Sequence, residues 1–309
     1  MTFAHGPMPL RDLTGAVGNT PLIRIRQIGR EFSGVEIYAK HEGFNPGGSV
    51  KDRPALQMIQ DALAAGSIDR TKSLIDSTSG NTGIAYSWIG AALGLKVTLV
   101  MPESVSRSRK QITKAFGAEQ VFSDPMDGSD GAIRLCRNLV AENPEKYFYP
   151  DQYSNHSNPK AHYLGTGREI WEQTQGRVTH FVAGIGTSGT VMGTGRRLKE
   201  CRAGIQVYAV EPAEPMHGLE GLKHMPTSIV PAIYQEAELD EKLSITTDAG
   251  WDLAERLGRE EGLFVGHSAG AALSGALVVA ARLHQRGERG VVVTLFPDRS
   301  ERYFEAGRL

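Results

Sequence analysis

The sequence has little cysteine, almost no net charge and no long apolar run. Cys136 and Cys201 are the only cysteines among 309 residues, and their isolation argues against a disulfide scaffold and a structural zinc site. Lys and Arg number 34 against 35 Asp and Glu, so there is no basic surplus for a nucleic acid or an anionic membrane. No run approaches the ~20 apolar residues of a membrane span, and no signal peptide is visible. We therefore expect a soluble, cytoplasmic protein without bound metal.

Glycine, by contrast, is abundant, with 36 in 309 residues, or about 12% against the ~7% of average proteins. Short β-branched runs alternate with helical patterns, and continuous apolar runs of this kind are typical of parallel strands covered on both faces. The expected strands lie at 35–38, 73–75, 97–100, 120–122, 147–149, 180–182, 207–210, 263–265 and 291–295. The pattern predicts an α/β fold with two open, mostly parallel twisted sheets flanked by helices.

The units form two groups, about 50–150 and 160–300, joined by a polar connection at 150–162. A helix is expected to begin at Asp52, as its cap, and to end at Gly66. The stretch 212–231 holds four prolines and has no period, and loops of this length usually carry function. Open parallel sheets bind ligands beyond the carboxyl ends of their strands, which directs attention to the turns that follow them.

The turn at 184–189 reads Gly-Ile-Gly-Thr-Ser-Gly, and Glu211 ends the next strand, as in a dinucleotide-binding fingerprint. Thr187, Ser188 and Thr190 add hydroxyl donors to the backbone N–H groups of this turn. Those donors suit a terminal phosphate monoester better than a pyrophosphate bridge. A tight turn without a ligand is the alternative.

The turn at 266–270 reads Gly-His-Ser-Ala-Gly and fits the nucleophile elbow of α/β-hydrolases. That interpretation needs an acid and then a histidine later in the chain, but His284 precedes the best acid, Asp298. We therefore interpret Ser268 as a hydrogen-bonding group at the end of a strand, and His267 as a packing or surface residue.

Two further segments carry donors and a lysine. The turn at 78–83 places the side chains of Thr78, Ser79, Asn81 and Thr82 around exposed N–H groups, which favours a carboxylate receptor; helix capping would explain only one of them. Lys51, in Asn-Pro-Gly-Gly-Ser-Val-Lys-Asp-Arg, directly precedes a helix N-terminus, whose dipole lowers the pKa of its amine. A solvated surface lysine is the alternative.

Taken together, the segments 45–53, 78–83 and 184–190, with Gly-Asn-Thr-Pro-Leu at 18–22 and 297–303, resemble the pyridoxal-phosphate enzymes of the cysteine synthase family (O-acetylserine sulfhydrylases, fold type II). The residues at 180–200 and the short C-terminus are most similar to the B-type members. The resemblance implies a tryptophan synthase β-like fold with a smaller domain at 44–156 and a larger one at 1–43 and 157–309. The active site would lie in the cleft between them, in a homodimer. A complex with serine acetyltransferase stays open.

The resemblance also implies a role for each motif residue. Lys51 would be the Schiff-base lysine of pyridoxal 5'-phosphate, and Asn81 would bond the oxygen of the ring hydroxyl. Ser268 would face the pyridine nitrogen. The phosphate would be held by Gly186, Thr187, Ser188, Gly189 and Thr190, and the substrate carboxylate by Thr78, Ser79, Gly80, Thr82 and Gln152.

The implied reaction is a β-replacement in which Lys51 moves the α-proton and a sulfur donor replaces the β-substituent of O-acetyl-L-serine or O-phospho-L-serine. Sulfide is the family's common acceptor, and thiosulfate or bulkier donors stay open. Lys223 is predicted to meet an anionic leaving group or acceptor, with a solvated lysine as the alternative. The competing interpretations are a cystathionine β-synthase-like enzyme, a nicotinamide-dependent dehydrogenase and a non-catalytic binding subunit.

Overall fold

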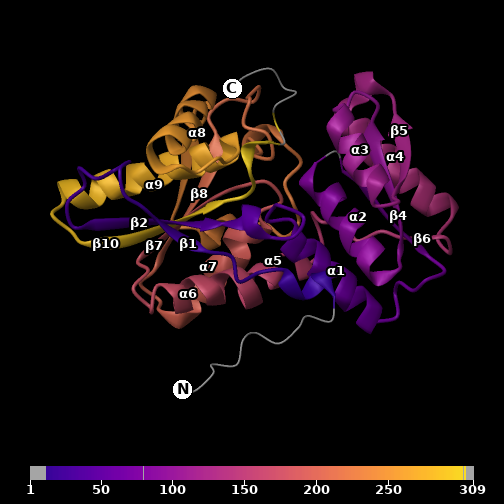
Figure 1. Cartoon of the computed structure of the whole chain (residues 1–309), viewed down its shortest axis with the longest axis horizontal. Coiled ribbons are helices and arrows are strands. Elements are labelled where there is room, and N and C mark those ends of the chain that lie inside the picture. The colour runs from indigo at the N-terminus through magenta and orange to yellow at the C-terminus, as the bar shows by residue number, and fades with distance from the viewer. Residues whose placement is uncertain (1–11, 79, 302, 304–309) are drawn as a thin grey trace, which may run out of the picture.

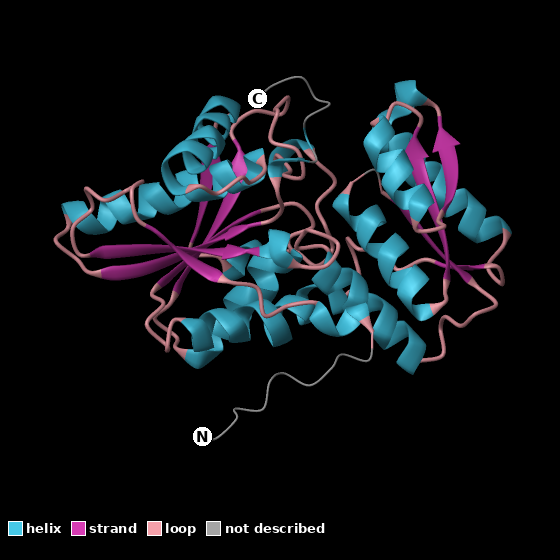
Figure 2. Ribbon diagram, viewed as in Figure 1, coloured by secondary structure: helices cyan, strands magenta, loops and turns pink. Residues whose placement is uncertain are grey.

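The computed structural model describes residues 12–78, 80–301 and 303, and these residues form two sheets with helices on both faces of each (Figure 1). Figure 2 shows the strands of the larger sheet fanning out, as they do in a twisted sheet. No helix in these residue ranges is long and apolar enough to cross a membrane. The expected fold class is confirmed.

The larger sheet has six strands, and β1 is its only antiparallel member among the described residues. Its order is β1 (Leu22–Ile25), β2 (Val35–His41), β10 (Gly290–Phe296), β7 (His180–Gly184), β8 (Gln206–Pro212) and β9 (Glu241–Ile245). Helices α8 (Thr247–Glu261) and α9 (His267–Gln285) lie on one side of it, and α6 (Arg168–Gln173) and α7 (Gly189–Cys201) on the other (Figure 1). β10 is buried along its whole length, which explains its continuous apolar run.

The smaller sheet is parallel, in the order β5 (Glu119–Ser123), β4 (Lys96–Pro102), β3 (Ser73–Ser77) and β6 (Tyr147–Phe148). Helix α2 (Asn81–Leu93) covers one face, with α1 (Asp52–Ala64) and α3 (Arg107–Ala115) packed against it. Helix α4 (Gly128–Glu142) covers the other face and buries Cys136, as its helical spacing predicts; burial raises the pKa of that thiol to about 12. The carboxyl ends of strands from both sheets face the cavity between the sheets.

One predicted strand is wrong, and two strands of the structure were not predicted. Residues 263–265 are not a strand: Val265 makes only an isolated bridge to Arg299, because β2 and β7 already pair with both edges of β10. Strands β1 and β9 were not predicted. Both lie at sheet edges, and polar residues interrupt them (Arg24 in β1, and Glu241, Lys242 and Ser244 in β9), so neither has a long continuous apolar run.

Two local predictions also differ from the structure. Asp52 does not cap α1, since Lys51 holds the cap position, and the Asp52 carboxylate instead accepts hydrogen bonds from the Gly47 N–H and from Trp88 Nε1 at 3.0 Å. Part of the predicted polar connection at 150–162 is helical: α5 spans Ser157–Ala161 and continues into a π-helical turn at His162–Gly167.

A buried cluster of four charged side chains joins the start of α1 to the larger sheet. Arg53 Nε lies 2.6 Å from Glu42 Oε2, and Arg53 Nη1 lies 2.7 Å from Glu169 Oε1. Lys40 Nζ lies 2.6 Å from Glu169 Oε2. Each charge has a partner of opposite sign, which is the condition under which buried charges are tolerated. The cluster fixes α1, and with it Lys51, relative to β2 and α6.

Candidate active site

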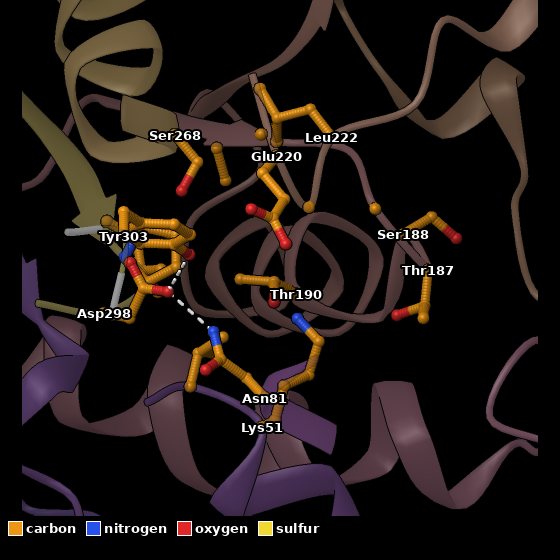
Figure 3. A pocket seen from close by; sticks show the side chains of 17 residues that line it. Lys51, Asn81, Thr187, Ser188, Thr190, Glu220, Leu222, Ser268, Asp298 and Tyr303 are labelled. Atoms are coloured by element: carbon orange, nitrogen blue, oxygen red, sulfur yellow. Dashed lines mark hydrogen bonds between the residues drawn. The ribbon is translucent and has the colours of Figure 1, made fainter. Parts of the chain in front are cut away.

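A cavity of about 430 Å³ opens where the strands of the two sheets end. It is lined from the smaller-sheet side by the β3–α2 turn and α3, and from the larger-sheet side by the β7–α7 turn and the loop after β8. A deeper recess continues from it to Ser268 and Asp298, and Figure 3 looks into that recess. The cavity therefore lies beyond the carboxyl ends of parallel strands, where ligands of open α/β sheets bind.

Lys51 enters this recess from the N-terminus of α1. The backbone before it is fixed to the end of β10, because Val50 N–H donates to the Pro297 carbonyl oxygen at 2.8 Å and Ser49 forms a bridge to Asp298. Burial lowers the pKa of the Lys51 amine, and the Asp298 carboxylate partly offsets that shift. The direction agrees with the prediction, but the cause is burial rather than the helix dipole. In Figure 3 the amine points into the recess between Thr190 and Asn81.

The glycine-rich turn forms a concave surface opposite Lys51. A Cβ atom on Gly186 would lie 2.5 Å from the Gly221 carbonyl oxygen, and one on Gly189 would lie 1.9 Å from Asn158 Oδ1, so both positions require glycine. Ser188 adopts a left-handed backbone with φ of +71° at the N-cap of α7. Its buried hydroxyl has no hydrogen-bond partner within the described residues. A phosphate oxygen would satisfy that hydroxyl at the N-terminus of α7.

Two residues that sequence reasoning missed support the same turn. Asn158 Nδ2 donates to Thr187 Oγ1 at 3.0 Å, and His162 Nε2 lies 3.3 Å from Thr190 Oγ1. Burial lowers the pKa of His162 to about 3, so this ring is neutral at neutral pH. Both come from the segment at 150–162, where the polar composition was the only signal.

Ser268 lies across the recess from Lys51, at the start of α9, and its side chain is buried. Figure 3 shows its hydroxyl pointing into the recess. The neighbouring His267 stacks on Trp251, with ring centroids 4.3 Å apart, and its ring lies 5.9 Å from that of Tyr303. The packing interpretation of His267 is therefore supported.

Asn81 begins α2 and reaches the recess from the smaller-sheet side. Its Nδ2 donates to Asp298 Oδ2 at 2.6 Å, and the Tyr303 hydroxyl donates to the same oxygen at 2.5 Å. Burial and the Asp298 charge raise the pKa of the Tyr303 hydroxyl. Neither Asp298 nor Tyr303 was predicted as a site residue, although both lie in the motif at 297–303.

The outer cavity is lined by Thr78, Gly80, Thr82 and Gln152, so the structure brings these members of the expected carboxylate receptor together. Thr82 Oγ1 donates to Gln152 Oε1 at 2.9 Å, which joins the β3–α2 turn to the segment after β6. Ser79, the remaining member of the predicted carboxylate receptor, lies outside the described residues.

The loop after β8 closes the cavity from the larger-sheet side. Lys223 N–H donates to the Ile185 carbonyl oxygen at 2.8 Å, and Lys223 Nζ lies 4.9 Å from the centre of the Tyr153 ring. The Lys223 side chain is partly buried and lines the outer cavity, and this burial lowers the pKa of its amine. Glu220 of the same loop forms an ion pair with Arg109 of α3.

Comparison with known proteins decides the family. The family model "Pyridoxal-phosphate dependent enzyme" matches residues 13–298. A cysteine synthase of Aquifex aeolicus is 55% identical over 289 residues, which cover 93% of this chain and 88% of that protein. The chain belongs to the cysteine synthase family. Cysteine synthase B of Pseudomonas aeruginosa is 41% identical over 295 residues, 96% of either chain. A cysteine synthase structure from Entamoeba histolytica superposes with a TM-score of 0.92 at 35% identity, covering 98% of this chain and 92% of that one.

These relatives confirm the predicted family, the fold type and the dependence on pyridoxal phosphate, and they support O-acetylserine sulfhydrylase activity. A dehydrogenase and a hydrolase do not fit this family. The residues present fit the cofactor: the unpartnered Ser188 hydroxyl and the tight Gly186 and Gly189 positions suit a phosphate, and a buried amine stands opposite. No cluster of His, Cys, Asp and Glu in the described part of the chain could hold a metal ion.

Proposed function

We propose that this enzyme makes L-cysteine from O-acetyl-L-serine and sulfide, with Lys51 as the residue that moves the proton. The observation that carries the proposal is the placement of one buried amine between a phosphate cradle, a buried serine hydroxyl and a turn of hydroxyl donors. Each of these groups has a separate role in a β-replacement. In a dinucleotide-binding site or a hydrolase site, Lys51 would have no role.

Pyridoxal phosphate, when bound, supplies an electron sink for the substrate α-carbon. We assign its phosphate to residues 186–190, its ring hydroxyl oxygen to Asn81 and its pyridine nitrogen to Ser268. A serine hydroxyl is neutral and does not protonate that nitrogen as an acid would, so less carbanion charge is drawn into the ring and loss of a β-substituent is favoured over transamination.

The chain's own residues then perform the exchange. Lys51 Nζ accepts the proton from the substrate Cα as a general base, which its lowered pKa favours. The Cβ–O bond breaks and acetate leaves with the bonding electrons. Hydrosulfide adds to Cβ, and Lys51 returns a proton to Cα. The hydroxyls of Thr78 and Thr82, with Gln152 and the backbone N–H groups of their turn, would hold the substrate carboxylate throughout.

An activity assay on the purified, cofactor-loaded protein tests this function. We expect L-cysteine to form from O-acetyl-L-serine and sulfide, with acetate released in equal amount. Serine plus homocysteine serves as the comparison, because a cystathionine β-synthase would use that pair instead. Turnover of serine with homocysteine but not of O-acetyl-L-serine with sulfide would contradict the proposal.

Lys223 provides a second test, because its half-buried amine lines the outer cavity. We expect Lys223→Ala to lower kcat/KM for O-phospho-L-serine relative to O-acetyl-L-serine by about tenfold, since a cation next to a dianionic substituent is worth on the order of 1.4 kcal/mol. Lys223→Arg should keep the preference of the wild type. An unchanged ratio in Lys223→Ala would remove this role.

We further propose that the chain works as a cytoplasmic homodimer with domains at 44–156 and at 1–43 with 157–309. The free thiols of Cys136 and Cys201 support a reducing compartment. The domain division is supported by the smaller sheet, whose strands β3 to β6 all fall between residues 73 and 148. A complex with serine acetyltransferase stays an open possibility of the same cavity.

A further inference from the structure

One ion pair spans the mouth of the active-site cavity. Arg109 Nη2 of α3 binds Glu220 Oε1 of the loop after β8, so the two charges come from opposite walls. The guanidinium carbon of Arg109 also lies 6.0 Å from the centre of the Tyr303 ring. Only 18% of the Arg109 side chain is exposed, against 47% of Glu220. The pair therefore lies at the boundary between cavity and solvent.

Glu220 lines both the outer cavity and the deeper recess that holds Lys51 and Ser268. Figure 3 shows its carboxylate pointing toward the middle of that recess, on the side opposite Asn81 and Lys51. A substrate whose carboxylate lies at the turn of residues 78–82 and whose α-carbon lies at Lys51 has its β-substituent in the remaining space. That space is bounded by Glu220, Arg109 and Lys223.

The charge of Glu220 decides which substituents that space accepts. Its carboxylate neutralises Arg109, which would otherwise attract an anion with a planar fork of donors. A phosphate on the substrate would meet the Glu220 carboxylate and would have to separate it from Arg109. A neutral acetyl ester does neither. Repulsion of this kind is a common source of discrimination between similar ligands.

We propose that Glu220 is a specificity-determining residue that favours neutral over anionic β-substituents by holding Arg109 in an ion pair. The inference rests on the proposed function and adds the substrate class to it. Glu220 disfavours an anionic β-substituent, whereas Lys223 favours one. The two residues of this loop therefore have opposite effects on the preference between O-phospho-L-serine and O-acetyl-L-serine.

The test compares O-phospho-L-serine with O-acetyl-L-serine in Glu220→Gln, which removes the charge but keeps the size of the side chain. We expect the ratio of kcat/KM values to shift about tenfold toward the phosphorylated donor, since an arginine freed from its carboxylate to meet a dianion is worth on the order of 1.4 kcal/mol. Adding Arg109→Gln to this variant should cancel most of the shift, because Arg109 would supply the new attraction. Glu214→Gln is the matched control, as an exposed glutamate of the same loop that does not line the cavity.

The outcomes separate the two hypotheses. If the wild type makes cysteine from O-acetyl-L-serine but Glu220→Gln keeps the wild-type ratio, the inference is wrong and the proposed function stands. An equal fall for both donors would also overturn it, because it would show that Glu220 only holds the loop in place. If the wild type uses neither donor, the proposed function fails, and this inference fails with it.

Discussion

Lys51→Ala should reduce cysteine formation by about a thousandfold or more, within the range that general-base catalysis contributes. The loss follows because Lys51 supplies the only amine of the described residues that lines both the deeper recess and the outer cavity. The variant should also lose the visible absorbance that comes from the lysine-linked cofactor. Steady-state assays and an absorbance spectrum of the same preparation measure both effects.

Lys114→Ala is the control for this experiment, because Lys114 is an exposed lysine in the last turn of α3. It should keep the spectrum and the rate of the wild type. A Lys51→Ala protein that still turned over O-acetyl-L-serine at a rate within tenfold of the wild type would refute the assignment of the base.

Arg53→Met should destabilise the fold by about 3–5 kcal/mol, the usual cost of removing one partner from a buried ion pair. The substitution leaves Glu42 and Glu169 buried without their main counter-charge, and only Lys40 remains beside Glu169. Arg53 directly follows the first residue of α1, so we also expect weaker cofactor binding through a misplaced Lys51. Urea unfolding of the cofactor-free protein measures the first effect, and a cofactor titration measures the second.

Arg256→Met is the matched control, since Arg256 forms an exposed pair with Glu260 one turn along α8. Such pairs contribute about 0.3–0.5 kcal/mol, so this variant should unfold close to the wild-type midpoint. Equal midpoints for the two variants would mean that the buried cluster contributes nothing that an exposed pair does not.

Much of the lining of the candidate cofactor site could be predicted from the sequence, because it comes from local turns. The segment at 184–190 combines glycines with hydroxyls directly after a strand, and the segment at 78–83 repeats the pattern. Lys51, directly before a helix, is likewise marked by its local sequence. Short-range patterns of this kind determine backbone geometry without knowledge of the rest of the fold.

Residues that depend on long-range packing were not predictable in the same way. Asn158 reaches Thr187 from 29 positions away, and Arg109 meets Glu220 across the cavity. Nothing local to α3 distinguishes Arg109 from the exposed basic residues around it. The edge strand β9 was missed because it is short and buries only Leu243 and Ile245, so its alternation is too brief to identify a strand.

The position of β10 in the larger sheet also determines which of the two sheets can form first while the chain is being synthesised. β10 is made last of the described strands, yet it lies between β2 and β7, which precede it by more than 100 residues. The strands of the smaller sheet are close together in the sequence and can pair early. In the larger sheet, β2 and β7 each keep one unpaired edge until β10 has been synthesised. Because Pro297, directly after β10, anchors the backbone beside Lys51, a nascent chain can complete the candidate cofactor site only after β10 has been synthesised.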